Sequence, residues 1–208
     1  MISNKQRLRA LRFARIVVAA RFDRARGQEI LSAMQAQYQL LAPTIPPLTL
    51  RINRMLLQIA VDTLAFYRAL PSIIPLDERL DAAQAFVNAW MEGQFDRWIA
   101  RKVYANHMLH RLYRQWWFRS ANRADEAAGW RYEYLPPAND LYYGVNVLRC
   151  GIVKYLAEQG APELAPILCR GDLHIRRYLP EGVVFRRTQV IAEGADSCDF
   201  RYLITSDQ

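Results

Sequence analysis

The sequence lacks the features that mark most membrane and secreted proteins. It has no apolar run of about 18 residues, the length at which a membrane-spanning helix is expected. The short apolar run from Ile16 to Ala20 is followed at once by Arg21, which argues against a signal peptide. Only 3 of the 208 residues are cysteine, and an odd number cannot form a complete disulfide framework. We therefore expect a cytoplasmic protein with free thiols.

Lysine is also scarce, so the formal net charge of +8 comes almost entirely from arginine. A basic balance favours anionic partners: nucleic acid, membrane surfaces or carboxylate ligands. No block of about five or six like charges occurs, and the arginines between Arg7 and Arg15 alternate with Leu8, Leu11 and Phe13. This spacing is typical of the solvated face of an amphipathic helix. We expect a small-molecule carboxylate as partner, neither nucleic acid nor a membrane, and leave a homo-oligomer open.

Residues 1–128 have the apolar spacing of helices, and with 52% hydrophobic residues the chain can bury a substantial core. The prolines between Ala42 and Pro47 mark a linker, since proline cannot continue a helix. Gly27 is a candidate break in the segment before it. The expected helices cover about Asn4–Leu40, Leu50–Ala69 and Leu76–Ser120.

Residues 129–208 change to the alternating pattern of strands. Helices are expected over about Cys150–Gln159 and Glu163–Arg177, between the second and third strands. Helices followed by a segregated set of strands indicate an α+β fold with an antiparallel sheet of about four strands, packed with residues 1–128 as one unit. The expected strands are Trp130–Leu135, Leu141–Leu148, Val183–Val190 and Cys198–Ile204.

All three cysteines lie in this C-terminal part, each in a distinctive setting. Cys150 falls where a strand gives way to a helix, and there backbone N–H groups and the helix dipole would stabilise a thiolate. Cys169 lies three residues before Asp172, so the two share a helical face. Cys198 opens the last strand. Against these readings, a free cysteine is commonly a small buried hydrophobe.

Arg187 is the second unusual residue of this part. If the last two strands form a hairpin, Gln189 opposes Cys198, and Arg187 lies with Gln189 on an otherwise apolar sheet face. A guanidinium on such a face needs a partner, because an unpaired buried charge is expensive. The partner is either a bound carboxylate, which arginine clamps with two hydrogen bonds, or a structural carboxylate of Asp172 or Asp199.

Other catalytic motifs are missing. The chain has no glycine-rich phosphate loop, no G-x-S-x-G and no C-x-x-C, and no carboxylate completes an H-E-x-x-H pattern around His107 and His110. The residues alone therefore define a cysteine-containing α+β domain with a candidate anion pocket.

A series of short motifs runs through about residues 141–203, and their order and spacing are more specific than any one of them. They are Arg149–Cys150, Gly160 with Glu163–Leu164, Cys169 with Asp172, Arg187–Gln189, and Gly194–Arg201. The set resembles the L-2-amino-thiazoline-4-carboxylic acid hydrolase family, and the resemblance implies a bacterial cytoplasmic enzyme. The N-terminal half is similar more loosely, at Ile45–Pro46 and Phe66–Leu70.

The family name implies hydrolytic opening of a 2-amino-thiazoline ring to give an N-carbamoyl cysteine. Water must attack the amidine carbon while the ring C–S bond breaks, which needs a base or nucleophile, an acid and a carboxylate anchor. We assign Cys198 or Cys150 as nucleophile, Asp172 as base or orienting group, and Arg187 as anchor. No cofactor is implied. The substrate-binding surface is expected to include Arg187, Gln189, Cys169 and Asp199.

Two alternatives stay open. The C-terminal pattern is also similar to vinyl-reductase-like ligand-binding domains, which favours a small-molecule-binding or sensor domain without turnover. A metal ion held by two or three cysteines with Asp172 or His174 is the other. Turnover of a cyclic amidine separates the enzyme from the sensor, and metal analysis of the purified protein tests the metal site.

Overall fold

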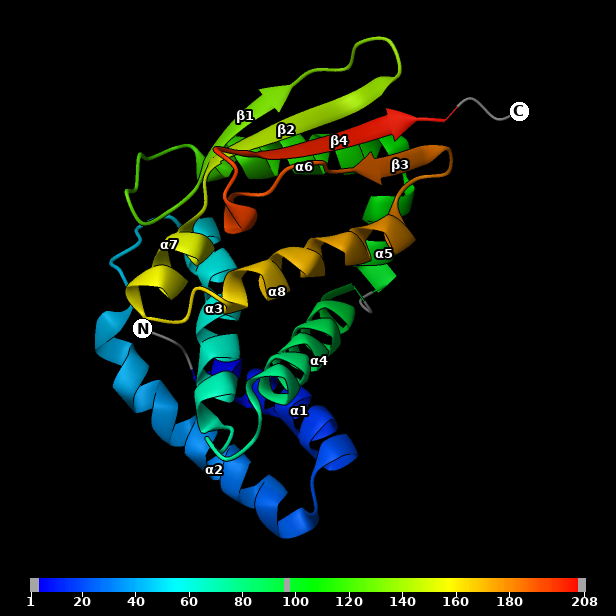
Figure 1. The fold of residues 1–208 in the computed structure, drawn as a ribbon. Helices are drawn as coiled ribbons and strands as arrows, with labels where there is room; N and C mark the ends of the chain where they lie inside the picture. Colours follow the sequence, from blue (N-terminus) through cyan, green and yellow to red (C-terminus); the bar gives the residue numbers. More distant parts are fainter. Residues whose placement is uncertain (1–3, 96–97, 206–208) are drawn as a thin grey trace.

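The computed structural model describes residues 4–95 and 98–205. The N-terminal part is helical as predicted, and Figure 1 shows its first two helices at the end of the molecule away from the sheet. None of the helices in the described part combines the length and apolar character of a membrane span. The helices are α1 (Asn4–Arg21), α2 (Arg24–Leu41), α3 (Arg51–Ala69), α4 (Leu76–Phe95), α5 (Trp98–Ala105) and α6 (His107–Ala121), with the short 3-10 helix η1 (Ala42–Thr44) after α2.

The C-terminal part forms one antiparallel sheet in the order β1-β2-β4-β3. The helices α7 and α8 come between β2 and β3 in the chain, and Figure 1 shows them below the sheet. This arrangement confirms the predicted α+β class and sheet. The elements are β1 (Arg131–Leu135), β2 (Leu141–Arg149), α7 (Gly151–Glu158), α8 (Leu164–Gly171), β3 (Val183–Arg186) and β4 (Cys198–Ile204), with 3-10 helices η2 (Asp172–Tyr178) and η3 (Ile191–Glu193).

The prediction of a break at Gly27 is wrong, because the chain turns at Phe22–Asp23 instead. Asp23 caps α2 by accepting a hydrogen bond from the backbone N–H of Arg26 at 2.9 Å. Gly27 lies inside α2, where an added Cβ would come within 2.6 Å of Val18 Cγ1. This glycine therefore allows α1 and α2 to approach closely.

The predicted helices Leu76–Ser120 and Glu163–Arg177 are both interrupted. The first divides into α4, α5 and α6, and Asn106 caps α6 by accepting from the N–H of Leu109 at 3.0 Å. The second ends as α8 at Gly171 and continues as the tighter η2. Apolar spacing persists through both breaks, and for this reason the sequence pattern did not show them.

The sheet turns one face toward the helices and the other toward solvent. Tyr143 pairs with Tyr202, which pairs in turn with Phe185, and all three are buried on the inner face. The outer face is polar, with Arg201 donating to Asn146 at 2.8 Å.

The register between β3 and β4 is the predicted one, but the predicted strand Val183–Val190 is too long. The ladder ends at Arg186. The backbone N–H groups of Thr188 and Gln189 donate instead to the carboxylate of Asp199, at 2.8 and 2.7 Å. Beyond Arg186, the side chain of Asp199 therefore accepts the hydrogen bonds that the backbone of a paired strand would otherwise accept.

The buried apolar side chains of helices and sheet form one continuous cluster, with α3 near its centre. This helix contacts α2, α4, α6, α7 and α8. It buries residues on all sides, including the polar Asn53, Gln58, Asp62 and Thr63. An amphipathic surface helix would keep such groups in water, so their burial on α3 points to specific partners.

The start of α3 is held from a distance by Glu126. Its carboxylate accepts hydrogen bonds from the backbone N–H of Thr49, from that of Leu50 at 2.9 Å and from the amide of Asn53 at 2.7 Å. Burial works against ionisation of Glu126, but these hydrogen bonds outweigh it and lower its pKa. The contact joins the loop before β1 to the central helix.

We expect Glu126→Ala to lower the free energy of unfolding at pH 7 by about 1–3 kcal/mol, the usual cost of leaving hydrogen-bond donors without their charged acceptor. Because the folded-state pKa is lowered, the contribution is present above the ordinary value of 4.5 and is lost as the pH falls through the folded value. Denaturant unfolding of the wild type and the variant at pH 7 measures the loss, and the same comparison at pH 3.5 measures how much of it disappears in acid. The neighbouring Asp125→Asn, which breaks an exposed ion pair with Arg149, is the matched control and should have a much smaller effect. An equal loss of unfolding free energy in both variants would contradict the role of Glu126 at the start of α3.

Candidate functional site

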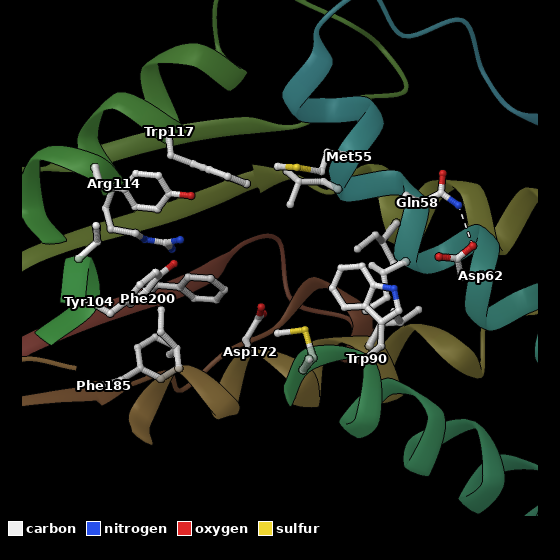
Figure 2. Close-up of a pocket in the computed structure, with 18 of the residues that line it drawn as sticks. Met55, Gln58, Asp62, Trp90, Tyr104, Arg114, Trp117, Asp172, Phe185 and Phe200 are labelled. Atoms are coloured by element: carbon white, nitrogen blue, oxygen red, sulfur yellow. Dashed lines mark hydrogen bonds between the residues drawn. The ribbon is translucent and has the colours of Figure 1, made fainter. Parts of the chain in front are cut away.

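A cavity of about 600 Å³ lies between α3, α4 and α6 on one side and η2 with the inner sheet face on the other. Figure 2 shows it as a space with Arg114 at one end, Gln58 and Asp62 at the other, and Asp172 between them. Pockets that hold small organic ligands have this size and a mostly apolar wall with a few polar groups. The apolar wall includes Met55, Leu56, Trp90, Met91, Trp117 and Phe200.

Arg114 projects from α6 into a cage of tyrosines. Its guanidinium lies 4.7 Å from the ring centre of Phe118 and donates to the hydroxyl of Tyr202 at 3.5 Å, while its buried Nε has no partner. Burial alone would lower the pKa of Arg114, but the hydroxyls of Tyr202, Tyr104 and Tyr143 outweigh it and raise the pKa. No carboxylate in the described part of the chain forms an ion pair with this arginine. It presents a positive charge to the cavity.

His110 supports this cage from behind. It is fully buried, and its Nε2 lies 3.3 Å from the hydroxyl of Tyr143. Burial, with smaller contributions from Arg114 and His107, lowers the pKa of His110 to about 3. The imidazole is therefore neutral at physiological pH and adds no second positive charge beside Arg114.

Asp172 is the carboxylate that faces Arg114 across the cavity. It begins η2, and 44% of its side-chain surface remains exposed, opening into the cavity. Desolvation by the surrounding protein atoms raises the pKa of Asp172 to about 6, although the positive charges of Arg187 and Arg114 act to lower it. Asp172 is thus ionised at neutral pH yet more basic than an ordinary aspartate, a property that suits a general base.

Arg187 lies behind Asp172 and does not line the cavity. Its side chain is 8% exposed, and its guanidinium donates to the carbonyl oxygen of Cys169 at 2.9 Å and to Asp172 at 3.3 Å. It also lies over the ring of Phe200. The sequence analysis left two partners open for Arg187, a bound carboxylate or a carboxylate of the protein itself. The structure shows the second, the carboxylate of Asp172. The arginine that faces the cavity is Arg114, which the sequence analysis missed.

The three cysteines converge beside this ion pair. Cys150, Cys169 and Cys198 are close enough to influence one another's ionisation and that of Asp172, but none of them lines the cavity. The sulfur of Cys198 accepts a hydrogen bond from the N–H of Ile191 at 3.3 Å.

The surroundings of Cys150 disfavour the predicted thiolate. The backbone N–H groups of Ile152 and Val153 do favour it, but burial is stronger and raises the pKa of Cys150 to about 11. Burial also raises the pKa of Cys169 and Cys198. All three sulfurs are therefore protonated near neutral pH.

The remaining predicted residues hold the loop after β3. Asp199 accepts from the N–H and hydroxyl of Thr188 and from the N–H of Gln189, and these hydrogen bonds, outweighing burial, lower its pKa. Gln189 is exposed. Neither residue lines the cavity.

Asp62 marks the end of the cavity away from Arg114. It is 1% exposed, and its Oδ1 accepts from the hydroxyl of Tyr38 at 2.8 Å and from the amide of Gln58 at 2.7 Å. Burial raises the pKa of Asp62 to about 7, although Tyr38, Gln58 and Trp90 donate hydrogen bonds to it. This carboxyl group is occupied by protein donors.

A metal centre was the third hypothesis. Across residues 4–95 and 98–205, no group of three or more histidine, cysteine, aspartate or glutamate side chains is arranged to hold a metal ion. His174, a predicted ligand, lies with its Nε2 3.2 Å from the side-chain oxygen of Asn88.

The fold is α+β, and the cavity has the size and the apolar lining typical of small-molecule sites. Residues 58–202 match the family model described as L-2-amino-thiazoline-4-carboxylic acid hydrolase, and this match covers more than half of the chain. The chain belongs to this family. No curated protein and no solved structure matches it. Arg114, Asp172 and Asp62 all lie within the matched region.

The sequence did contain a signal for the two residues that were missed. Arg114 follows His110 by four residues and precedes Phe118 by four, so it lies on the buried stripe of α6. Asp62 stands between Val61 and Leu64 in the most apolar stretch of α3. A charged residue in an apolar stripe needs a partner in the interior.

The protonated state of the thiols predicts slow alkylation. At pH 8 a thiol with a pKa of about 11 is a thiolate in roughly one molecule per thousand. We expect iodoacetamide to modify Cys150 about 100-fold more slowly in the folded than in the unfolded protein, and Cys169 and Cys198 also more slowly, as followed by mass spectrometry of each cysteine-containing peptide. Rapid modification of Cys198 or Cys150 in the folded protein would restore the case for a thiolate nucleophile.

Proposed function

We propose that the protein is a hydrolase that opens a carboxylate-bearing cyclic amidine, with the substrate carboxylate bound by Arg114 and the attacking water activated by Asp172. The observation that carries this proposal is the presence of these two opposite charges in one cavity with largely apolar walls. The substrate class combines a carboxylate with a basic amidine, and Arg114 and Asp172, which face each other across the cavity, complement these two groups. Membership of the hydrolase family supports the reaction type.

The role of Arg114 follows from its surroundings. A guanidinium is planar and binds a carboxylate through two parallel hydrogen bonds. Tyrosine hydroxyls surround Arg114, with Tyr202 at 3.5 Å, and a neutral hydroxyl leaves the positive charge uncompensated. In an apolar cavity an ion pair with a ligand is stronger than the same pair in water. Arg114 therefore supplies the anchor that the sequence analysis had assigned to Arg187.

The role of Asp172 is proton transfer. Water donates a proton to this carboxylate as its oxygen bonds to the amidine carbon. Asp172 passes this proton to the ring nitrogen, whose double bond to the amidine carbon has become single. The tetrahedral intermediate then collapses: its hydroxyl becomes the carbonyl, the carbon–sulfur bond breaks, and the hydroxyl proton moves through Asp172 to the departing sulfur. The sum is addition of one water, loss of one C–S bond and release of one thiol. Arg187 positions the carboxylate through the 3.3 Å contact.

A cysteine nucleophile, as assigned from the sequence to Cys198 or Cys150, is less consistent with the geometry. Both thiols are protonated and lie behind the cavity wall, whereas Asp172 faces the cavity. Cys169 contributes only its backbone oxygen to the contact with Arg187. The water mechanism needs none of these thiols in ionised form.

Asp172→Asn should lower kcat by about 10²–10⁴-fold, the range expected for removal of a general base. In the wild type, kcat/KM should fall below pH 6 and level off above it, because the base works only when deprotonated. The measurement is thiol released from a 2-amino-thiazoline carboxylate between pH 4.5 and 8.5, with thermal unfolding as the control for folding. Full activity of Asp172→Asn, together with loss in Cys198→Ser, would establish the cysteine mechanism instead.

Arg114→Lys should raise KM about 10- to 100-fold with a smaller change in kcat, because lysine keeps the charge but loses the two-pronged contact. Arg111→Lys, at an exposed position of the same helix, is the matched control and should leave KM unchanged. An unchanged KM in Arg114→Lys would remove the anchor. If the wild type binds the ring tightly but never releases a thiol, the binding domain without turnover is the correct reading.

A further inference from the structure

The size of the cavity points to a substrate larger than the single ring in the family description. We propose that the natural substrate carries a bulky apolar group on the exocyclic nitrogen of the amidine, and that this group lies between Met55, Trp90 and Met91. The inference rests on the proposed function and deepens it, because it assigns the class of substrate to the same site.

The first argument is volume. One water molecule occupies about 30 Å³ in the liquid, and a one-ring amino-thiazoline carboxylate has the bulk of roughly five waters, or about 150 Å³. The cavity measures about 600 Å³. Cavities of about 300–1,000 Å³ accommodate ligands of the size of drugs, most of whose surface they cover. A single ring would therefore leave most of this space filled with water against an apolar wall.

The second argument is the distribution of polar groups. Arg114 and the hydroxyls of Tyr104 and Tyr202 lie together at one end, and Asp172 follows. Beyond Asp172, Figure 2 shows Met55 and Trp90 on the way to Gln58 and Asp62. The carboxyl group of Asp62 is 1% exposed and accepts hydrogen bonds from the protein, so it offers no open site for a cationic group. Arg9 also lines the cavity and, by its charge, acts to lower the pKa of Asp62, so it belongs to this far polar end. The stretch between Asp172 and that end is therefore the part that fits an apolar group.

The third argument is an exposed methionine. Met55 lines the cavity and keeps 44% of its surface uncovered, although it lies on the most buried helix. A flexible methionine adapts its shape to an apolar ligand, and covering it removes apolar surface from water. Trp90 and Met91, from α4, complete this part of the wall.

The ring chemistry fixes the point of attachment. In a 2-amino-thiazoline-4-carboxylate, the carbon that bears the carboxylate and the amidine carbon flank the ring nitrogen, and the exocyclic nitrogen points away from the carboxylate. With the carboxylate at Arg114 and the amidine carbon near Asp172, a group on the exocyclic nitrogen extends toward Trp90. Hydrolysis still adds one water and breaks the C–S bond, so the product is a cysteine whose carbamoyl nitrogen bears the apolar group.

The experiment compares two synthetic substrates, the unsubstituted ring and its N-benzyl derivative, by released thiol. We expect kcat/KM to be at least tenfold higher for the N-benzyl compound, because burial of a benzyl group adds apolar contact. Met55→Trp fills the proposed subsite and should reduce this ratio at least fivefold. Met108→Trp, on the exposed face of α6, is the matched control and should leave the ratio unchanged. A ratio of one or less in the wild type would overturn the inference while leaving the proposed hydrolysis intact.

A calorimetric titration keeps the two proposals separate. The probes are the imidazoline analogues of the same two compounds, which have nitrogen in place of the ring sulfur. Tighter binding of the N-benzyl analogue by at least tenfold is expected and supports the subsite even in the absence of turnover. Equal affinities of the two analogues would overturn it. Loss of thiol release from both substrates would count only against the hydrolysis.

Discussion

The contact between Arg187 and Asp172 is the constraint on which the rest of the site depends. Arg187 is 8% exposed, and a buried guanidinium without a carboxylate is costly. It meets this requirement by bonding to Asp172, and it also donates to the carbonyl of Cys169 near the end of α8. The pair therefore ties the junction of α8 and η2 to the sheet and keeps the carboxylate turned toward the cavity. The burial that makes Arg187 need its partner also raises the pKa of Asp172 to about 6.

The two arginines consequently have different tasks. Arg187 is occupied by protein acceptors, whereas Arg114 is surrounded by tyrosine hydroxyls and faces the cavity. The neutral His110 behind Tyr143 helps to keep the field near Arg114 that of a single cation. In the proposed complex, Arg114 and Asp172 on opposite sides of the cavity give a ligand with both charges a defined orientation. This orientation would direct the rest of the ligand toward Met55 and Trp90.

The sequence predicted the α+β class, the antiparallel sheet and the register of its last two strands, because alternation along a strand reports its buried face directly. It did not predict the break at Asp23 or the division between α5 and α6, where the side chain of Asp23 or Asn106 caps the start of the next helix without changing the apolar spacing. Within the site, Asp172 and Arg187 were found through the motif set, whereas Arg114 was missed. The partners of Arg114 are tyrosines on β2 and β4, and these come together with α6 only in the folded chain.

The central claim is that the substrate lies between Arg114 and Asp172. A crystal structure of the protein with the imidazoline analogue of the substrate, which cannot release a thiol, tests it most directly. The account predicts the analogue carboxylate within hydrogen-bond distance of the Arg114 guanidinium, and the amidine carbon on the side of Asp172 with room for one water between them. A carboxylate bound at Arg187, or an amidine carbon in contact with the sulfur of Cys198, would contradict it.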